Sequence, residues 1–394
     1  MQDLKESHTD SLPLAGYRVL ERSRGAATAY AGRLMATLGA TVILLEPETG
    51  SPLRQAPPWL DDDEQQSALF AYLSVGKRSL ICNLETATGK QLFNQQLQNA
   101  DIFIDDTPVA ERETLGLTPK AIAEKFPNLI HVSLLPFGAT GPKADWDGEE
   151  LNVVHAGSEG YLLPNGFAQE SFPERGPLKM YGHFAEYQGG VYAATAALSA
   201  LWSAPVSGGQ YIDVSSQAAV LLCGAYAMQR LGDGSLEHRA TRKFRYGGVF
   251  KTADGYIQLL TLEDRQWQGT VELMGNPEWT KAEWLQDPLE RSRRGDEINH
   301  HIREWMAQHS VEDIVSKAQE LGVPAAKYRN PEDVIAGEQE AFRGLFETTT
   351  LENGQQTEIL LAPFQFKFSP LHFTGGVPAL NEMAEPTRAG DINT

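Results

Sequence analysis

The feature that most constrains the fold is an alternation of strand-like and helix-like segments over the first 135 residues. Residues 17–21 and 40–46 are short apolar runs typical of buried strands, and the Ala-rich segment 24–38 between them has leucine and methionine at helical spacing. A strand, a helix and a second strand of this length form a parallel crossover unit. Near-continuous apolar strands suit a sheet that is covered on both faces, so this opening predicts a parallel sheet.

The same alternation continues beyond this unit. Further strands are expected over residues 78–84, 100–105 and 128–135, and helices over 88–99 and 119–126. The pattern predicts a doubly wound α/β domain, in which ligands bind at the carboxyl ends of the strands. Later expectations are helices over 148–157, 185–203 and 217–231, a turn into a strand over 208–215, and a hairpin over 247–262.

The charge balance excludes several classes of partner. The 394 residues contain 33 Lys and Arg against 52 Asp and Glu, a formal net charge of −19. A surface this acidic disfavours non-specific binding to nucleic acid or to an anionic membrane. No apolar run reaches the length of a membrane span, and the first ten residues lack the pattern of a signal peptide. We therefore expect a soluble cytoplasmic enzyme.

Motifs for metals, nucleotides and serine nucleophiles are missing from the sequence. The two cysteines, Cys82 and Cys223, lie in apolar runs and are expected to be buried thiols. There is no Cys/His cluster, no GxGxxG after the first strand, no P-loop and no GxSxG. We expect no metal and no redox cofactor.

A few charged residues are candidates for a site. Glu186 comes just before an apolar helix, where it could be a helix cap or, next to two glycines, a nucleophile or base. Arg54, Lys77 and Arg78 are candidate phosphate contacts at the carboxyl ends of strands, or ordinary exposed basic residues. From the residues alone, the chain is an α/β enzyme with an anionic ligand.

Residues 13–54 (PLAGYRVLERSRGAATAYAGRLMATLGATVILLEPETGSPLR) resemble the opening of the class III CoA-transferases. This is the CaiB/BaiF family, which includes formyl-CoA and crotonobetainyl-CoA:carnitine CoA-transferases and α-methylacyl-CoA racemase. Further matches follow in the family's order at residues 74–84 (SVGKRSLICNL), 137–142 (FGATGP), 246–260 (YGGVFKTADGYIQLL) and 363–370 (PFQFKFSP).

The resemblance implies a fold and an assembly. The family has a large Rossmann-like domain built from both chain ends, here residues 1–231 and 330–394, and a smaller α/β domain, here 232–329. Two such chains interlock as rings into a dimer. CoA lies on the large domain, and the active site lies near the dimer interface.

The resemblance also implies a nucleophile. In the transferases an Asp within a segment like PxADxxxGxYAA attacks the thioester, and an aspartyl-CoA intermediate carries CoA to the acceptor. The Asp position is Glu186 in this chain. Glutamate adds one methylene and moves the carboxylate by about 1.5 Å. A misplacement of about 1 Å can slow a tightly positioned reaction about 100-fold, so the pocket must suit the longer side chain.

Other family positions give further candidate residues. The CoA-contacting ENFRPG segment corresponds to residues 105–110, and Glu149 stands where the racemases carry the His of GHDxNY, with His155 nearby. The residues implied to contact CoA are Gly25, Ala27, Arg54, Lys77, Arg78, Asp106, Thr107 and Arg112. Glu149 and His155 are implied to contact the substrate.

Three functions remain open at this point. The first is transfer of CoA from an acyl-CoA thioester to a small carboxylic acid through Glu186, in a homodimer. The second is an acyl-CoA isomerase, racemase or lyase with Glu186 as acid or base. The third, suggested by the altered ENFRPG segment, is a non-catalytic member or a subunit that pairs with an active paralogue.

Overall fold

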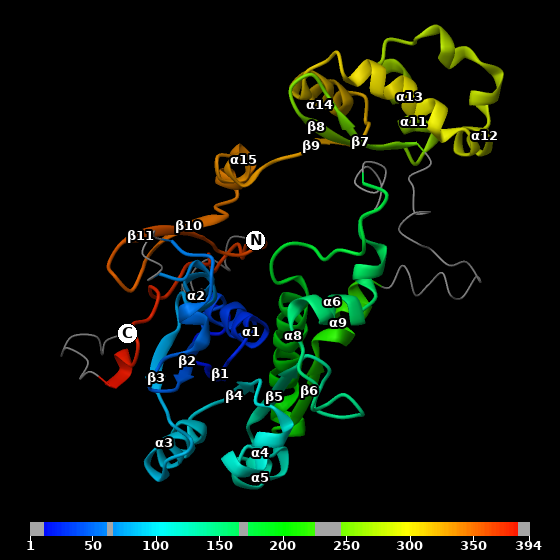
Figure 1. Ribbon diagram of the computed structural model, residues 1–394. Coiled ribbons are helices and arrows are strands. Elements are labelled where there is room, and N and C mark those ends of the chain that lie inside the picture. Colours follow the sequence, from blue (N-terminus) through cyan, green and yellow to red (C-terminus); the bar gives the residue numbers. More distant parts are fainter. Residues whose placement is uncertain (1–11, 61–65, 165–171, 225–245, 385–394) are drawn as a thin grey trace. The chain divides into compact units, whose positions relative to one another are not determined.

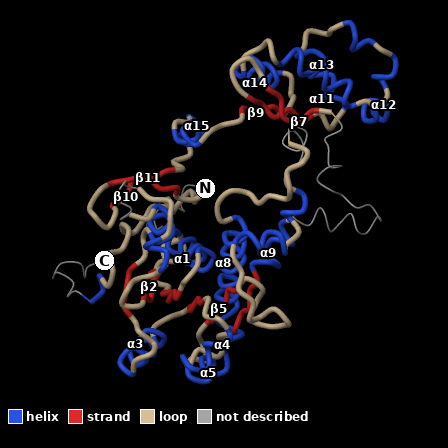
Figure 2. Tube along the Cα trace, in the orientation of Figure 1, coloured by secondary structure: helices blue, strands red, loops and turns tan. Residues whose placement is uncertain are grey.

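The computed structural model describes residues 12–60, 66–164, 172–224 and 246–384. Two compact units are formed (Figures 1 and 2). Unit 1 contains Met1–Glu159, Lys179–Ala225 and Glu338–Thr394, and unit 2 contains Gly160–Leu178 and Tyr226–Gly337. The expected boundary between residues 231 and 232 lies outside the described residues, as does the end of the helix expected over 217–231.

The centre of unit 1 is a parallel sheet of six strands in the order β3-β2-β1-β4-β5-β6. Its strands are β1 (Arg18–Arg22), β2 (Thr41–Glu46), β3 (Arg78–Ile81), β4 (Ile102–Asp105), β5 (Ile130–Leu135) and β6 (Tyr211–Ser215). The prediction of an α/β fold with a parallel sheet is confirmed. Because β1 pairs with both β2 and β4, the strand order reverses between β1 and β4, and the carboxyl ends of these two strands flank the crevice where such sheets bind ligands.

Helices of unit 1 connect these strands. They are α1 (Ala26–Thr37), α2 (Ala68–Ser74), α3 (Ala87–Gln98), α4 (Val109–Leu115), α5 (Pro119–Lys125), α6 (Glu150–Ala156), α8 (Phe184–Ser207), α9 (Ser216–Cys223) and α16 (Glu338–Phe342), with short 3-10 helices at Pro52–Gln55 and Glu382–Ala384. Two of these helices begin directly after a threonine N-cap. Thr86 caps α3, and Thr118 caps α5 ahead of Pro119. Helices α2 and α4 are not among the predicted elements.

Helices α1 and α8 pack closely against each other, and small residues make this possible. Ala31, Ala193 and Ala197 lie in the buried cluster between them. Gly190 lies so close to α1 that an added Cβ would come within 2.7 Å of the Ala27 carbonyl oxygen. This close approach brings the first turn of α8 next to the first turn of α1.

The end of the chain packs on the sheet region of unit 1. Strands β10 (Phe346–Thr350) and β11 (Gln356–Leu360) form an antiparallel hairpin. Ile359 and Val377 join the apolar cluster of Phe70 and Leu73 on α2. The described residues of Glu338–Thr394 thus belong to unit 1, and Leu351, Ile359 and Val377 enter its core.

Unit 2 has its own sheet and its own core. Strands β7 (Gly247–Lys251), β8 (Tyr256–Leu260) and β9 (Ala325–Lys327) form an antiparallel sheet. The hairpin predicted around Asp254-Gly255 is confirmed. Its helices are α11 (Asp264–Leu273), α12 (Pro288–Arg293), α13 (Gly295–Met306), α14 (Val311–Glu320) and α15 (Pro331–Ile335), with 3-10 helices at Glu278–Lys281 and Glu283–Gln286. A further 3-10 helix, Glu159–Leu162, spans the boundary between the two residue ranges.

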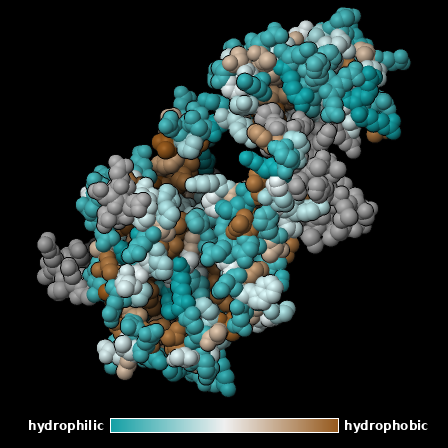
Figure 3. Space-filling model, in the orientation of Figure 1, coloured by the Kyte–Doolittle hydropathy of each residue, from teal (hydrophilic) through white to brown (hydrophobic). Residues whose placement is uncertain are grey.

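The surface follows from the charged composition. Figure 3 shows hydrophilic side chains over most of the face in view of each unit, with apolar residues in smaller areas. Cys82 is buried, but Cys223 is exposed, so the expectation of two buried thiols is wrong for Cys223, whose position on α9 faces outward. Among the described residues, no helix is both long enough and apolar enough to cross a membrane.

Candidate active site

The candidate site is built on the N-terminus of α1. The helix begins directly after β1, and Gly25 at its N-cap has no side chain to satisfy the free amides of the first turn. Two carboxylates from distant segments accept these hydrogens instead. Asp106 Oδ2 accepts from Gly25 N at 3.0 Å and from Arg24 N at 2.8 Å, and Glu186 Oε1 accepts from Ala26 N at 3.2 Å. The positive end of the α1 dipole stabilises both negative charges.

Both oxygens of the Glu186 carboxylate have partners. Oε1 lies on Ala26 N, and Oε2 lies 2.5 Å from His183 Nδ1. The two side chains are three positions apart at the start of α8 and remain partly open to solvent, with 26% of the Glu186 side chain and 32% of the His183 side chain exposed. Glu186 is therefore held in one place while it can still meet a ligand.

A third carboxylate caps α8. Glu150, at the start of α6, accepts hydrogen bonds from Ala185 N at 3.0 Å and from Glu186 N at 3.1 Å. These amides belong to the first turn of α8, which has no capping side chain of its own. Glu150 therefore fixes the backbone from which Glu186 projects.

Two pKa values in the site are displaced. Burial raises the pKa of Asp106 to about 6, although the amides of Arg24 and Gly25 favour its charged form. The hydrogen bond that His183 donates to Glu186 raises the pKa of His183 against the opposing effect of burial. The Glu186 carboxylate thus favours a protonated imidazole beside it.

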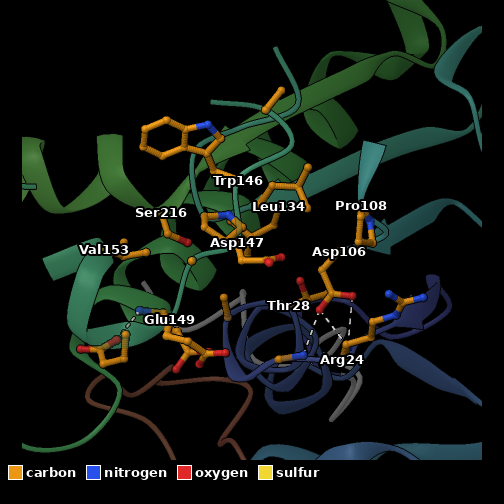
Figure 4. A pocket seen from close by; sticks show the side chains of 18 of the residues that line it. Arg24, Thr28, Asp106, Pro108, Leu134, Trp146, Asp147, Glu149, Val153 and Ser216 are labelled. Atoms are coloured by element: carbon orange, nitrogen blue, oxygen red, sulfur yellow. Dashed lines mark hydrogen bonds between the residues drawn. The ribbon is translucent and has the colours of Figure 1, made fainter. Parts of the chain in front are cut away.

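Glu186 lines a cavity of about 530 Å³ that we name the Glu186 pocket. Figure 4 looks into it, with Asp106 and Pro108 on one side and Val153 and Ser216 on the other. Its acidic lining residues are Asp106, Asp145, Asp147, Glu149, Glu150 and Glu186. Among the described residues that line the pocket, Arg24 is the one basic residue, and it forms an ion pair with Glu111 at 2.5 Å. The pocket is therefore strongly acidic.

A second cavity, of about 600 Å³, adjoins the first, and we name it the Arg22 pocket. It lies at the carboxyl ends of β1, β2 and β3 and shares Arg24 and Ala110 with the Glu186 pocket. Its lining residues are Arg22, Ser23, Arg24, Leu45, Glu46, Pro47, Pro52, Cys82, Asn83, Leu84, Glu85, Ala110, Glu111, Thr114 and Leu115. A long ligand could span both cavities past Arg24.

The structure brings several predicted site residues together. Gly25, Ala27, Asp106 and Glu149 line the pocket with Glu186. An added Cβ on Gly25 would stand 3.5 Å from Glu186 Oε1 and 3.9 Å from Asp106 Oδ2, so Gly25 lies between the two carboxylates.

Other predicted residues lie behind or beside the pockets. Thr107 is buried, and its Oγ1 accepts a hydrogen bond from Arg22 at 2.6 Å. Arg112 is also buried and donates to the Thr107 carbonyl, to Tyr211 and to Ser133. His155 lies on α6 and is not among the residues that line the Glu186 pocket.

The three basic residues expected at strand ends are placed differently. Arg54 lies after β2 as expected, but its guanidinium binds Glu46 and Glu352, each at 2.8 Å. Arg78 is the first residue of β3 and Lys77 directly precedes it, so their expected position at the carboxyl ends of strands is wrong: they lie at the amino end of β3. Lys77 is fully buried, with Nζ 2.6 Å from Glu21 Oε2. Arg78 is exposed and lines a separate cavity with Glu382.

Sequence reasoning missed two residues of the site. His183 could have been found, because residues three apart on a helix share a face and His183 precedes Glu186 by three. Glu150 follows Glu149 and so stands at the Asp position of the GHDxNY segment, but its contact with Glu186, 36 residues away, could not be predicted from local spacing. Among the described residues, no group of three or more His, Cys, Asp or Glu side chains is arranged to hold a metal ion.

Comparison with known proteins gives consistent matches along the chain. The family model for CoA-transferase family III matches residues 14–383. The chain is 28% identical over 386 residues to the succinate–glutarate CoA-transferase of Agrobacterium fabrum, covering 94% of this chain and 93% of that protein. It is 27% identical over 365 residues to subunit BbsE of the succinyl-CoA:(R)-benzylsuccinate CoA-transferase of Thauera aromatica, covering 89% and 87%.

A solved structure matches as well. The crystal structure of a CAIB/BAIF family protein from Brucella suis superposes with a TM-score of 0.83 at 26% sequence identity. The match covers 95% of this chain and 97% of that one. The similarity therefore includes both units of the fold.

Proposed function

The chain belongs to CoA-transferase family III, and we propose that it moves CoA from an acyl-CoA thioester to a small carboxylic acid with Glu186 as the nucleophile. The observation that carries the proposal is the position of Glu186. It lines a cavity, and its carboxylate accepts a hydrogen bond from Ala26 N in the first turn of α1. The curated relatives named above are CoA-transferases that act on dicarboxylic acids, by their names.

The reaction proceeds by two exchanges at Glu186. The carboxylate attacks the thioester carbonyl carbon, which gives a mixed anhydride and releases the CoA thiolate. The thiolate then attacks the glutamyl carbonyl carbon, frees the donor acid and leaves a glutamyl-CoA thioester. An acceptor carboxylate reverses these two steps, takes the CoA and restores Glu186. No proton is gained or lost overall.

The surroundings of Glu186 support this chemistry. A carboxylate is a weak nucleophile, so the gain must come from positioning and from stabilising the oxyanions that form. Ala26 N–H and His183 each contact one carboxylate oxygen, and Glu150 holds the backbone of the same residue. The longer side chain of glutamate is thus held in position by a contact to each of its two carboxylate oxygens.

The two adjoining cavities suggest how CoA would bind. We assign the thioester to the Glu186 pocket and the nucleotide part to the Arg22 pocket, since they meet at Arg24 and Ala110. Arg22 and Arg24 would offset the phosphates of CoA. Ala27 and Gly25 would line the thioester path. Thr107 and Arg112 would support Arg22 from behind.

The assembly is part of the proposal. We assign a Rossmann-like large domain and a smaller domain to the chain, and an interlocked homodimer to the active enzyme. The name of the Thauera aromatica relative describes a subunit, which favours pairing with a paralogue as the second arrangement. The mass of the purified protein in solution separates the two.

The His183–Glu186 contact favours one second candidate. A carboxylate and an imidazole 2.5 Å apart could remove and return the α-proton of an acyl-CoA, as an isomerase or racemase requires. That reaction would exchange deuterium from solvent into the acyl group without moving CoA to another acid.

The test uses succinyl-CoA as donor and glutarate as acceptor, and measures glutaryl-CoA by mass spectrometry. The wild type should form glutaryl-CoA, and Glu186→Gln should form it at less than about a thousandth of that rate. Glu320→Gln, on the exposed face of α14, is the matched control. Equal rates for Glu186→Gln would contradict the proposal. Solvent deuterium in succinyl-CoA without transfer would favour the second candidate.

A further inference from the structure

The contact between His183 and Glu186 also suggests a role for His183 in catalysis, and this inference rests on the proposed function. We propose that His183 donates a hydrogen bond to the oxygen of Glu186 that becomes negatively charged when an acceptor attacks the glutamyl-CoA thioester. His183 would thus be an oxyanion donor of the transfer reaction, supplied by the same helix as the nucleophile.

The geometry separates the two oxygens of Glu186. Oε1 is the oxygen closest to Gly25, which lines the Glu186 pocket. Oε2 lies on His183 Nδ1, and His183 is not among the pocket-lining residues. A substrate that enters the pocket therefore meets Oε1, and Oε2 stays against the imidazole.

This assignment decides which oxygen remains on the enzyme. Oε1 attacks the thioester and departs with the donor acid, so Oε2 becomes the carbonyl oxygen of glutamyl-CoA. When the acceptor carboxylate attacks the glutamyl carbon, the electron pair of the carbonyl bond moves onto Oε2. It returns when the CoA thiolate leaves. A donor in contact with Oε2 throughout stabilises this charge without reorganisation.

The charged groups around the imidazole favour its role as a donor. Glu186 and Glu150 raise the pKa of His183, with the hydrogen bond that His183 donates to Glu186 as the largest cause, while burial and Lys179 oppose them. The ring of Tyr187 lies 5.7 Å from the imidazole, centroid to centroid. Before Glu186 reacts, the two carboxylates thus keep a proton on the ring that faces Oε2.

The experiment follows the glutamyl-CoA thioester in a single turnover. Enzyme loaded with succinyl-CoA is mixed with glutarate, and the peptide that carries Glu186 is monitored by mass spectrometry after an acid quench. His183→Ala should slow the discharge on the order of 100-fold, the usual effect of losing one oxyanion donor, with the KM for succinyl-CoA changed less than about twofold. His183→Asn should recover at least about tenfold of this loss, because its amide nitrogen is bonded to Cγ as Nδ1 is.

Two controls keep the result clear. His300→Ala removes an exposed histidine of α13 and should discharge at the wild-type rate. An NMR titration of His183 should show a lower pKa in Glu186→Gln than in the wild type, and this readout does not need turnover.

The outcomes are distinct. Discharge of His183→Ala within about twofold of the wild type, or an unchanged His183 titration, overturns the inference and leaves the proposed function intact. A wild type that never carries CoA on Glu186 overturns the proposed function, and this inference falls with it.

Discussion

Glu186 Oε1 lies 3.2 Å from the backbone nitrogen of Ala26, a residue 160 positions earlier in the chain. This hydrogen bond places the proposed nucleophile at the positive end of α1, beside the crevice at the carboxyl ends of β1 and β4. It exists because α1 and α8 pack at a distance that small side chains allow. The reactivity of the site therefore depends on the packing of these two helices.

Gly190→Ala tests this dependence. The new Cβ would lie 2.7 Å from the Ala27 carbonyl oxygen, so the two helices must move apart. We expect a loss of about 1–3 kcal/mol in the free energy of unfolding, together with a lower transfer rate. Denaturant unfolding and the glutaryl-CoA assay measure the two effects. Gly176→Ala, where nothing lies within 4 Å of the new Cβ, is the control. Full activity in Gly190→Ala would show that the transfer rate does not depend on the packing of α1 against α8.

Gly25→Ala should lower the activity while leaving the stability of the fold nearly unchanged. Gly25 has an extended backbone with φ of −119°, which alanine adopts, and the new Cβ would make only ordinary contacts of 3.5 and 3.9 Å with the two carboxylates. The fold should keep its stability within about 0.5 kcal/mol. The Cβ would occupy the space above Glu186 Oε1, so we expect at least about a tenfold loss of kcat/KM for succinyl-CoA. Unchanged kinetics would show that the thioester enters elsewhere.

Lys77→Met tests whether this lysine stabilises the fold or binds CoA. Lys77 and Glu21 are both fully buried, and burial lowers the pKa of Lys77 and raises that of Glu21. Removing the lysine leaves a buried carboxyl group without its partner, which should cost about 3–5 kcal/mol of unfolding free energy. Glu21→Gln in the same chain should recover part of it. An unchanged stability with weakened CoA binding in calorimetry would support the CoA contact implied by the family resemblance.

The stability of the chain should depend on the charge of Asp106. Burial raises the pKa of this carboxyl from 3.8 to about 6. The folded protein then binds a proton more tightly than the unfolded chain, so the folded state loses stability as the pH rises through this window, by up to about 3 kcal/mol. From about pH 7 upwards, one unit above the pKa in the folded protein, the loss is complete and constant.

Asp106→Asn removes this titration. Measured by denaturant unfolding between about pH 4 and pH 6.5, the variant should gain stability relative to the wild type as the pH rises. The changed hydrogen bonds from Arg24 N and Gly25 N to the amide side chain add a constant offset that does not vary with pH. Parallel curves for the two proteins would contradict the raised pKa.

The acidic wall of the Glu186 pocket should weaken the binding of anionic acceptors. Asp147→Asn removes one of its negative charges. We expect the KM for glutarate to fall about two- to fivefold at low ionic strength, with a smaller difference at about 0.5 M salt, because salt screens exposed charges. A KM that does not change with the variant or with salt would show that the acceptor avoids this wall.

The sequence allowed the fold to be predicted where the pattern is local. Apolar runs such as residues 40–46 and the Ala-rich helix before them identify a parallel sheet without further information. The family pattern located Glu186, because its neighbours Gly190 and the Ala193-Ala194 pair are retained in the helix that packs on α1.

The partners of individual side chains could not be predicted in this way. Lys77 looks like a surface residue after a glycine, but its charge is paired with a glutamate 56 positions earlier in the core. Arg54 likewise binds Glu352, 298 positions later. Such pairings arise only when distant segments pack together, which is also why Glu150 was missed as the cap of α8.

The most direct test of the central claim is to look for CoA bound to Glu186. The protein is incubated with succinyl-CoA, quenched in acid, digested and examined by mass spectrometry, with and without hydroxylamine. We predict that the peptide containing Glu186 carries CoA as a thioester, that hydroxylamine converts this glutamate to a hydroxamate, and that Glu186→Gln shows neither product. Transfer of CoA to glutarate without a covalent species at Glu186, or with the CoA on another carboxylate such as Asp106, would contradict the account.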